Sequence, residues 1–190
     1  MTDGSSEINV TSGHPFRILV AGHALSGKDT AARMLSEASG GILRSGLSTS
    51  EFYCRKVYPD NWSARLTEFK ATPKGRQNLA HLIAFYNKHE RGTPHWPGAQ
   101  LYGEMVCTGI DVIVGIRRLE EVVACVKLKL LTHAVWVERD VPTDATQGYE
   151  AGDLPWLFGN AVYVVWNKED LADLPQKVRK VWERIRGGVQ

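Results

Sequence analysis

An apolar segment that breaks into a glycine-rich turn and then into a helix-forming segment constrains this chain more than any other feature. Residues 17–21 read Arg-Ile-Leu-Val-Ala, and residues 22–28 follow as Gly-His-Ala-Leu-Ser-Gly-Lys. Apolar residues then recur at helical spacing between Ala31 and Leu35. A buried strand, Gly-x-x-x-x-Gly-Lys and a helix in this order predict a phosphate-binding loop, because backbone N–H groups, a lysine and the positive end of a helix dipole converge on one anion.

A nucleoside triphosphate is the expected ligand of this loop, with Lys28 bridging the β- and γ-phosphates of ATP. The loop departs from the usual pattern at Asp29, where Ser or Thr is typical, and Thr30 follows one place later. The residues expected around the triphosphate are Gly22, His23, Ala24, Leu25, Ser26, Gly27, Lys28, Asp29 and Thr30. His23 lacks metal-ligand spacing to other histidines and is interpreted as a spacer.

Mg²⁺ is the expected cofactor, and its preference for oxygen ligands points to Thr30 or Asp29, directly or through water. The sequence leaves open which of the two contacts the metal. Asp29 has two other interpretations: a general base toward the acceptor hydroxyl, or a carboxylate stabilised by the helix dipole.

Strands and helices alternate along the rest of the chain, which predicts a three-layer α/β fold with a mainly parallel sheet. The expected strands are continuous apolar runs, typical of strands buried on both faces. They cover residues 17–21, 111–116, 134–137 and 161–166. The expected helices cover residues 28–39, 76–88, 100–108, 119–131 and 174–186.

Residues 15–190 are predicted to form a single domain, preceded by a loose polar tail at 1–14. The interval from 40 to 99 shows no clear strand after Leu47, and its aromatic and basic composition predicts a mostly helical insertion, at about 48–98, that binds an acceptor. A loop is expected at residues 93–98, where prolines and a glycine obstruct regular structure.

The bulk composition limits the class of protein. The net charge of +2 is too small to indicate a nucleic-acid partner by itself. Three cysteines without C-x-x-C spacing suggest neither a disulfide framework nor a zinc site, which fits a reducing cytoplasm. No signal-peptide pattern and no apolar run near the ~20 residues needed to span a bilayer are found, so a soluble protein without a membrane partner is expected.

Two segments carry a resemblance to a known family. Ser26-Gly-Lys-Asp-Thr30, together with Asp111-Val-Ile-Val-Gly-Ile-Arg-Arg-Leu-Glu-Glu121, resembles the bacteriophage P-loop kinases of the deoxynucleoside monophosphate kinase (thymidylate kinase-like) group. Within that group the chain is most similar to the phage 5-hydroxymethyluracil DNA kinases. Residues 134–139 resemble the fourth strand of such kinases, and residues 165–171 resemble their usual ending. The resemblance covers Phe16 to the end and is weakest from 40 to 71, where acceptor choice would be decided.

Phosphoryl transfer needs cations and N–H donors around the transferred group, because charge accumulates on its peripheral oxygens. The expected catalytic residues are Lys28, Asp29, Arg117 and Arg139. Arg117 and Arg118 follow a strand at the edge where parallel sheets bind ligands, and one of them is expected to face the phosphates while the other pairs with Glu120 or Glu121. Arg139 is expected to act as a lid arginine. No clear candidate stands out for a metal-binding Asp at the end of a strand, because Asp111 begins its strand and Asp140 follows Glu138 and Arg139.

The acceptor is expected to contact the insertion, whose aromatic and cationic residues suit stacking on bases and neutralising phosphates. Arg76, Gln77 and Arg118 are the predicted acceptor-binding residues, and Arg76 and Gln77 are expected to open a helix. The same composition also suits an amphipathic helix with aromatics in its core.

The resemblance implies an ATP-dependent kinase of the host-cell cytoplasm that phosphorylates the hydroxymethyl group of 5-hydroxymethyluracil in phage DNA, a step of thymidine hypermodification. A free deoxynucleoside monophosphate kinase is the alternative within the class. A nucleotide-binding switch or assembly protein that transfers no phosphoryl group is the alternative from another class. Oligomeric state is left open.

Overall fold

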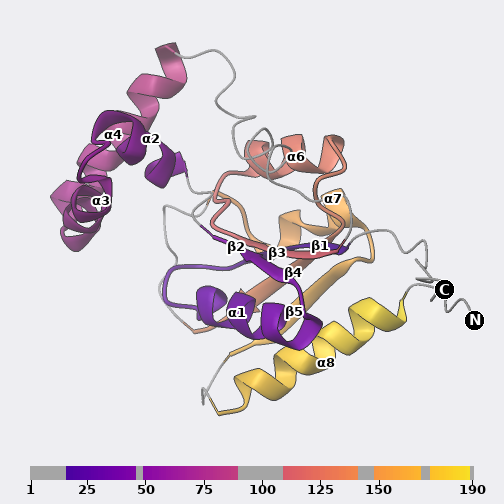
Figure 1. The fold of residues 1–190 in the computed structure, drawn as a ribbon. Coiled ribbons are helices and arrows are strands. Elements are labelled where there is room, and N and C mark those ends of the chain that lie inside the picture. Colours follow the sequence, from indigo (N-terminus) through magenta and orange to yellow (C-terminus); the bar gives the residue numbers. More distant parts are fainter. Residues whose placement is uncertain (1–15, 46–48, 90–108, 141–147, 168–171, 189–190) are drawn as a thin grey trace, which may run out of the picture.

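Five parallel strands form the centre of the protein. The computed structural model describes residues 16–45, 49–89, 109–140, 148–167 and 172–188. The strands are β1 (Phe16–Ala21), β2 (Ile42–Arg44), β3 (Ile110–Val114), β4 (His133–Glu138) and β5 (Val162–Trp166), and they lie side by side in the order β2-β3-β1-β4-β5 (Figure 1). Leu19 of β1 lies opposite Ile113 of β3 and Ala134 of β4, all in parallel register.

Helices cover both faces of the sheet, which confirms the α/β class with layers of helix, sheet and helix. α1 (Lys28–Ser39) and α8 (Leu174–Gly187) pack on one face, while α6 (Leu119–Lys127), η2 (Ala151–Asp153) and α7 (Pro155–Phe158) lie on the other (Figure 1). Alternate residues of β1 serve the two layers. Ile18 and Val20 join the cluster with α1 and α8, and Leu19 and Ala21 join the cluster with α6. This two-sided burial explains the continuous apolar runs.

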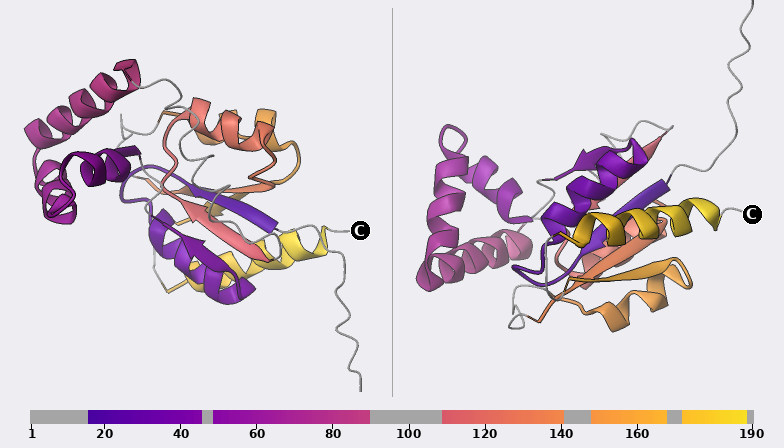
Figure 2. Two further views of the ribbon diagram at one scale, coloured as in Figure 1. Left: turned by 45° about the horizontal axis from the view of Figure 1, so that its top comes forward. Right: turned by 90° about the horizontal axis from the view of Figure 1, so that it is seen from below.

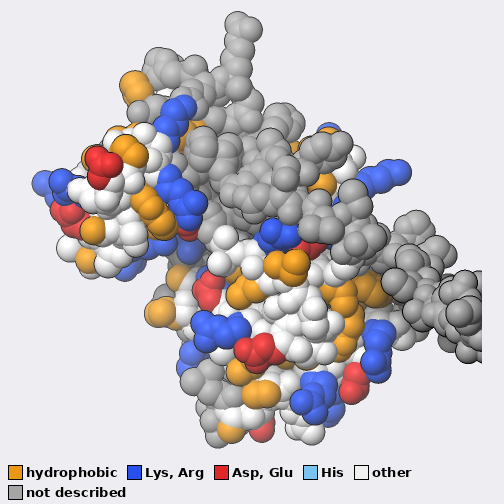
Figure 3. Space-filling view, viewed as in Figure 1, with side chains coloured by type: hydrophobic (Ala, Val, Ile, Leu, Met, Phe, Trp, Pro, Cys, Tyr) orange, Lys and Arg blue, Asp and Glu red, His pale blue; other side chains and the backbone are white. Residues whose placement is uncertain are grey.

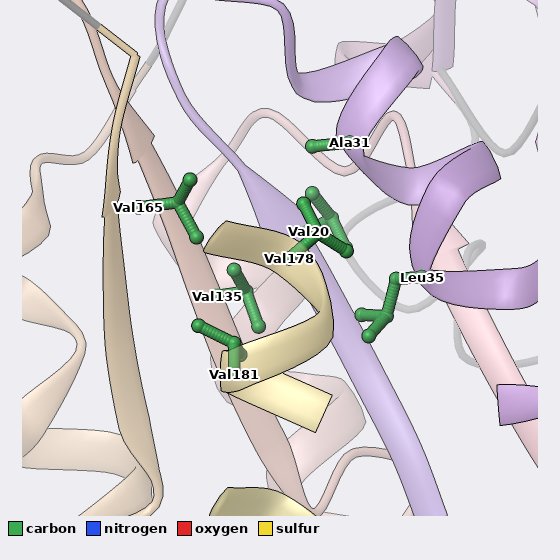
Figure 4. Close-up of a pocket in the computed structure, with 7 residues that line it drawn as sticks. All are labelled: Val20, Ala31, Leu35, Val135, Val165, Val178 and Val181. Atoms are coloured by element: carbon green, nitrogen blue, oxygen red, sulfur yellow. The ribbon is translucent and has the colours of Figure 1, made fainter. Parts of the chain in front are cut away.

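The interior between the sheet and α1 and α8 is filled by small and branched side chains (Figure 4). The residues around its remaining gap are Val20, Ala31, Leu35, Val135, Val165, Val178 and Val181. That gap is too narrow to hold a water molecule. This face is therefore a packed core, and a ligand site must be sought at an edge of the sheet.

The strand order locates that edge. β3 and β4 flank β1 on opposite sides, so the chain crosses over β1 between them. Open parallel sheets bind ligands in the crevice outside the carboxyl ends of the strands, where the order reverses. The glycine-rich segment, Gly22 to Gly27, follows the carboxyl end of β1 and leads directly into α1. We call it the glycine-rich loop.

Three helices inserted between β2 and β3 form a group with its own small core. They are α2 (Thr49–Val57), α3 (Trp62–Ala71) and α4 (Pro73–His89). Cys54, Leu66 and Leu79 are buried among them, with Trp62 and Phe69 packed alongside. These helices, which we call the helical insertion, stand to one side of the sheet (Figure 2). The expected helical character of this region is confirmed.

Several predicted boundaries were wrong for local reasons. β2 was not predicted, because a strand of three residues gives almost no periodic signal. The strand expected to reach Ile116 ends at Val114, where Gly115 turns the chain with a φ of 109°. The helix expected to reach Leu131 ends at Lys127, shortly before the left-handed Lys129. α4 begins three residues before Arg76.

The tail at 1–14, the loop at 93–98 and the helix at 100–108 lie outside the described residues. None of the helices within the described ranges is long and apolar enough to cross a membrane.

An ion pair ties β2 to β3. Arg44 Nε donates to Asp111 Oδ1 at 2.9 Å, with 15% of the Arg44 side chain and 5% of the Asp111 side chain exposed. Asp111 lies near the amino end of β3, the opposite edge from the glycine-rich loop. Its role is therefore structural, in agreement with its poor placement for a metal.

We expect Asp111→Ala to lower the free energy of unfolding by about 3 kcal/mol, because it leaves the Arg44 guanidinium buried without its carboxylate. Urea denaturation measures the loss. Glu68→Ala, which removes the carboxylate of the exposed pair between Arg65 and Glu68 at 2.7 Å, is the matched control and should cost less than about 1 kcal/mol. Equal losses in the two variants would contradict the structural role of the Arg44–Asp111 pair.

Candidate functional site

The glycine-rich loop lies in close contact with the ends of two neighbouring strands. A Cβ on Gly22 would lie 2.5 Å from the carbonyl oxygen of Val137 in β4, and a Cβ on Gly27 would lie 2.6 Å from Nδ2 of Asn167, just after β5. The φ angles of Gly22 and Gly27 are 149° and 92°. Both glycines are therefore required by space and by backbone conformation.

The tip of the loop holds a strained residue. Leu25 has a φ of 65° although it is not a glycine, and it is 80% exposed. Its carbonyl oxygen accepts a hydrogen bond from Nη1 of Arg139 at 3.2 Å. Backbone strain of this kind concentrates at functional sites. The contact brings the predicted lid arginine onto the loop.

Lys28 is turned inward at the start of α1. Its side chain is only 7% exposed, and Nζ donates to the carbonyl oxygen of His23 at 3.3 Å. Oδ2 of Asp29 lies 3.9 Å from the same nitrogen. A buried ammonium group needs oxygen atoms around it. From this position beside the loop, the Lys28 ammonium could contact an anion bound there.

Ser26 contributes an unsatisfied hydroxyl. Oγ of Ser26 is buried without a hydrogen-bond partner, whereas its carbonyl oxygen accepts from Nδ2 of Asn167 at 2.7 Å. Buried polar groups are nearly always hydrogen-bonded, so the Ser26 hydroxyl is a candidate hydrogen-bonding group for a bound anion. Asn167 holds the loop against the end of β5.

His23 points back into the protein. Nε2 of His23 lies 2.9 Å from Oε2 of Glu150, and its ring packs edge-on against Trp136 at 5.5 Å between centroids. Nε1 of Trp136 donates to Oε2 of Glu138 at 2.6 Å. His23 therefore anchors the loop to β4 and to the residue that caps η2, which agrees with its interpretation as a spacer.

Asp29 and Thr30 lie in the first turn of α1, as the metal prediction requires. The Asp29 side chain is 76% exposed, and Thr30 is half-buried. Within the described ranges no group of three or more His, Cys, Asp or Glu side chains could hold a metal. Mg²⁺ prefers oxygen ligands and usually keeps several waters, and its contact with Thr30 or Asp29 stays a prediction.

Arg117 and Arg118 occupy different environments. Arg117 is half-buried after the carboxyl end of β3, the same edge as the glycine-rich loop. Arg118 lies with Nη1 3.6 Å from Oε1 of Glu120, and its backbone pairs with Gly148. This arrangement matches the expectation that one arginine is structural. Arg118 as an acceptor-binding residue stays a prediction.

The predicted acceptor residues of the helical insertion are engaged within it. Nε of Arg76 donates to the carbonyl oxygen of Lys70 at 3.0 Å and so caps the end of α3, while Gln77 is exposed on α4. Because α4 already begins at Pro73, neither residue opens a helix, contrary to expectation. Their contact with an acceptor stays a prediction.

Cations and aromatics of α2 and α3 pair with one another. The Arg55 guanidinium lies 4.3 Å from the Trp62 ring centroid and 2.6 Å from Glu51, and Arg65 lies 5.6 Å from the Tyr58 ring centroid. At these positions the structure agrees with the alternative interpretation, that of amphipathic helices whose aromatic residues pack within the insertion, because both arginines already have partners.

Lys70 is the exception. Burial of its ammonium and the Arg117 guanidinium lower the pKa of Lys70, while the carboxylates of Glu51 and Asp29 act in the opposite direction. Lys70 lies in the last turn of α3, where its carbonyl oxygen accepts the hydrogen bond from Arg76.

Sequence reasoning missed two of these residues, Asn167 and Glu150. Asn167 could have been found, because a polar residue directly after a buried strand lies at the ligand edge of a parallel sheet. Glu150 does not directly follow a strand, and only the folding of the chain brings it into contact with His23. Lys70 belongs to the aromatic and cationic stretch that was expected to contact the acceptor, although it was not singled out within that stretch.

Comparisons of the chain with family models, with curated proteins and with solved structures give no match. The functional interpretation therefore depends on the geometry of the site.

We expect Gly27→Ala to lower the free energy of unfolding by at least about 2 kcal/mol, since the added methyl group meets Asn167 and a left-handed backbone alone costs about 1–2 kcal/mol. Gly40→Ala is the matched control, because Gly40 also has a positive φ of 67° but has open space around its Cβ position. Gly40→Ala should show the cost of the left-handed backbone alone. Urea denaturation measures the free energy of unfolding of both variants. Equal losses would mean that the loop does not depend on contact with Asn167.

Proposed function

We propose that this protein is an ATP- and Mg²⁺-dependent kinase with a P-loop nucleotide kinase fold, which transfers a phosphoryl group to a deoxynucleotide acceptor. The observation that carries the proposal is the glycine-rich loop at the carboxyl end of β1, with a buried Lys28 and a buried Ser26 hydroxyl that has no hydrogen-bond partner. The five-stranded parallel sheet with helices on both faces is compatible with that fold.

The donor phosphates would lie against the loop. Backbone N–H groups from Gly22 to Gly27, the Ser26 hydroxyl and the start of α1 supply hydrogen-bond donors and a positive dipole end. Lys28 would leave the long 3.3 Å contact with the His23 carbonyl and bind the β- and γ-phosphates. Arg139 donates a hydrogen bond to the Leu25 carbonyl of the loop, and this contact supports a role for its guanidinium beside the same phosphates.

The transfer step then depends on charge neutralisation. Lys28, Arg117 and Arg139 would stabilise the charge that develops on the peripheral oxygens of the phosphoryl group. Bound Mg²⁺ supplies further neutralisation of the β- and γ-phosphate oxygens. Thr30 would hold it with the help of water, since the Thr30 hydroxyl lies in the first turn of α1.

Asp29 is better placed to act on the acceptor. Its carboxylate is exposed, and it interacts electrostatically with Lys70 of the helical insertion. The helical insertion is the region that the resemblance assigns to the acceptor. We therefore assign Asp29 as the general base. Its carboxylate would take the proton of the acceptor hydroxyl.

The acceptor we favour is the hydroxymethyl group of 5-hydroxymethyluracil in DNA, on the resemblance to the phage kinases of that base. The cations and aromatics of α2 and α3 support a nucleotide-type acceptor, although Arg55 and Arg65 are already paired. A free deoxynucleoside monophosphate is the second candidate. A nucleotide-binding switch would need the same loop but no acceptor pocket, and the presence of the helical insertion favours the kinase.

We expect Lys28→Gln to abolish phosphoryl transfer, by at least about a hundredfold, because it removes charge from the transition state. The assay uses labelled ATP with duplex DNA containing 5-hydroxymethyluracil, and in parallel with free deoxynucleoside monophosphates. Lys180→Gln, at an exposed position of α8, is the control and should keep full activity. If the labelled phosphate appears only on free nucleotides, the protein is the second candidate, a deoxynucleoside monophosphate kinase. If the wild-type protein labels neither acceptor, the kinase assignment is contradicted.

Kinetic measurements should distinguish the roles of Asp29 and Thr30 at the start of α1. Asp29→Asn should lower kcat by about 10²–10⁴-fold with little change in the affinity for Mg²⁺-ATP, as expected for loss of a general base. Thr30→Ala should instead raise the Mg²⁺ concentration required for half-maximal rate. Steady-state kinetics at varied Mg²⁺ measure both. The reverse pattern would assign the metal to Asp29.

A further inference from the structure

β5 is an outer strand of the sheet, and one of its two sides is open. Among the strands of the described chain only β4 pairs with it. Its five residues, Val-Tyr-Val-Val-Trp, include no proline and no charged side chain. Proteins usually protect an outer strand with such residues or keep it short, because an open strand edge accepts another strand. β2, at the other end of the sheet, is protected in this way, since it has three residues and ends at Arg44.

The open side of β5 presents backbone donors and acceptors at every second residue. The amide of Asn167, directly after the strand, donates to β4. Because this direction alternates along a strand, Val162, Val164 and Trp166 turn their N–H and C=O groups to the open side. Nζ of Lys177 in α8 donates to the Trp166 carbonyl oxygen at 2.9 Å. The backbone groups that a further strand would bind are therefore those of Val162 and Val164.

Exposed apolar side chains accompany this edge. Val165 joins the core cluster with α8, whereas Val162 packs toward the cluster of α6 and α7. Side chains alternate along a strand, so Val164 and Trp166 project on the α7 side, where they are 42% and 53% exposed. α7 immediately precedes β5 in the chain, and its Trp156 is 91% exposed. Exposed apolar groups gathered in one place mark interaction sites.

The helical insertion also exposes hydrophobic side chains, but it offers no strand edge. Orange and blue side chains alternate over its surface in Figure 3, and Phe85 of α4 is 57% exposed. Its described elements are all helices. Only the side of the molecule with β5 and α7 therefore combines exposed tryptophans with an open edge, among the residues that the structure describes.

A second copy of this chain matches both features. Two copies related by a two-fold axis would place their β5 strands antiparallel. The carboxyl end of one strand, which carries Trp166, would then lie opposite the amino end of the other strand, which α7 precedes. Opposed residues of antiparallel strands project on the same face of the sheet. Trp166 of each copy would therefore meet the helix that carries Trp156 in the other copy.

We propose that β5 and α7 form a dimerisation surface, on which two copies of this chain join their sheets through antiparallel β5 strands. Because Lys177 already binds the Trp166 carbonyl, the backbone of Val162 pairs with that of Val164 in the other copy, and the two-fold axis passes beside Tyr163. The edge lies at the opposite end of the sheet from β2 and the helical insertion. The dimer thus leaves both glycine-rich loops accessible and does not depend on the kinase assignment.

The exposed area sets the expected affinity. An aromatic side chain buries about 150–250 Å², so Trp156 and Trp166 together offer on the order of 300 Å² in each copy. Two copies would bury about twice that area through these side chains, whereas stable interfaces begin at about 1,200 Å² in total. Val164, the strand backbones and the surrounding residues supply the remainder. We therefore expect a dissociation constant in the micromolar range.

Sedimentation velocity of the full chain tests the dimer. Over a range from about 1 to about 100 µM, which brackets a micromolar dissociation constant, the wild type should change from monomer to dimer. Val164→Lys should raise the dissociation constant at least about tenfold, because a lysine on an outer strand opposes pairing with another strand. Trp156→Gln should also weaken the dimer, and a side chain so exposed is not needed for folding.

A matched variant and a local probe identify the edge that is used. Ile42→Lys places the same charge on the other outer strand, β2, where the side chain is 52% exposed, and it should keep the dissociation constant of the wild type. Hydrogen exchange of residues 162–166 should slow as the wild-type concentration rises, whereas exchange in β2 should not change. Urea midpoints at low concentration establish that the variants fold.

Three results would overturn the inference. The wild type could remain a monomer over the whole range. A dimer could form that Trp156→Gln and Val164→Lys leave unchanged, or that Ile42→Lys weakens equally, and its interface would then lie elsewhere. The amides of β5 could be protected to the same extent at every concentration, which would mean that another segment of the chain covers the edge.

Discussion

The close packing of the glycine-rich loop against the ends of β4 and β5 is the constraint on which the rest of the site depends. Gly22 passes the Val137 carbonyl and Gly27 passes the Asn167 amide at distances that admit no Cβ. With the loop pressed into this position, Asn167 can bind the Ser26 carbonyl, and Lys28 can fold inward over the loop. A loop that stood further from the sheet would lose both contacts and would present its N–H groups to water.

The remaining charged groups reach the site because parallel strands end at one edge. Arg117 follows β3, Arg139 follows β4, and both therefore arrive beside a loop that follows β1. The helical insertion, which follows β2, leaves the sheet at the same edge. Residues distant in sequence thus end at one edge of the sheet, where the exposed carboxylate of Asp29 also lies.

The parts of the fold that were predictable are those with local signals. Continuous apolar runs identified four of the five strands, and glycine spacing located the loop, because both depend on neighbouring residues. β2 was not predicted, because a strand of three residues is too short to show a periodic pattern of apolar residues. The site was predictable where it lies next to the loop, as with Lys28 and Asp29. Glu150 was not, because its contact with His23 results from tertiary packing, and no spacing in the sequence encodes that packing.

A structure determined with a non-hydrolysable ATP analogue and Mg²⁺ tests the central claim most directly. The account predicts a β-phosphate within about 3 Å of the Gly27 and Lys28 backbone nitrogens. It also predicts that the Ser26 hydroxyl and Lys28 Nζ contact phosphate oxygens, with Lys28 withdrawn from the His23 carbonyl. An analogue bound at another edge of the sheet, or a loop that keeps the Lys28–His23 contact and excludes the phosphates, would contradict it.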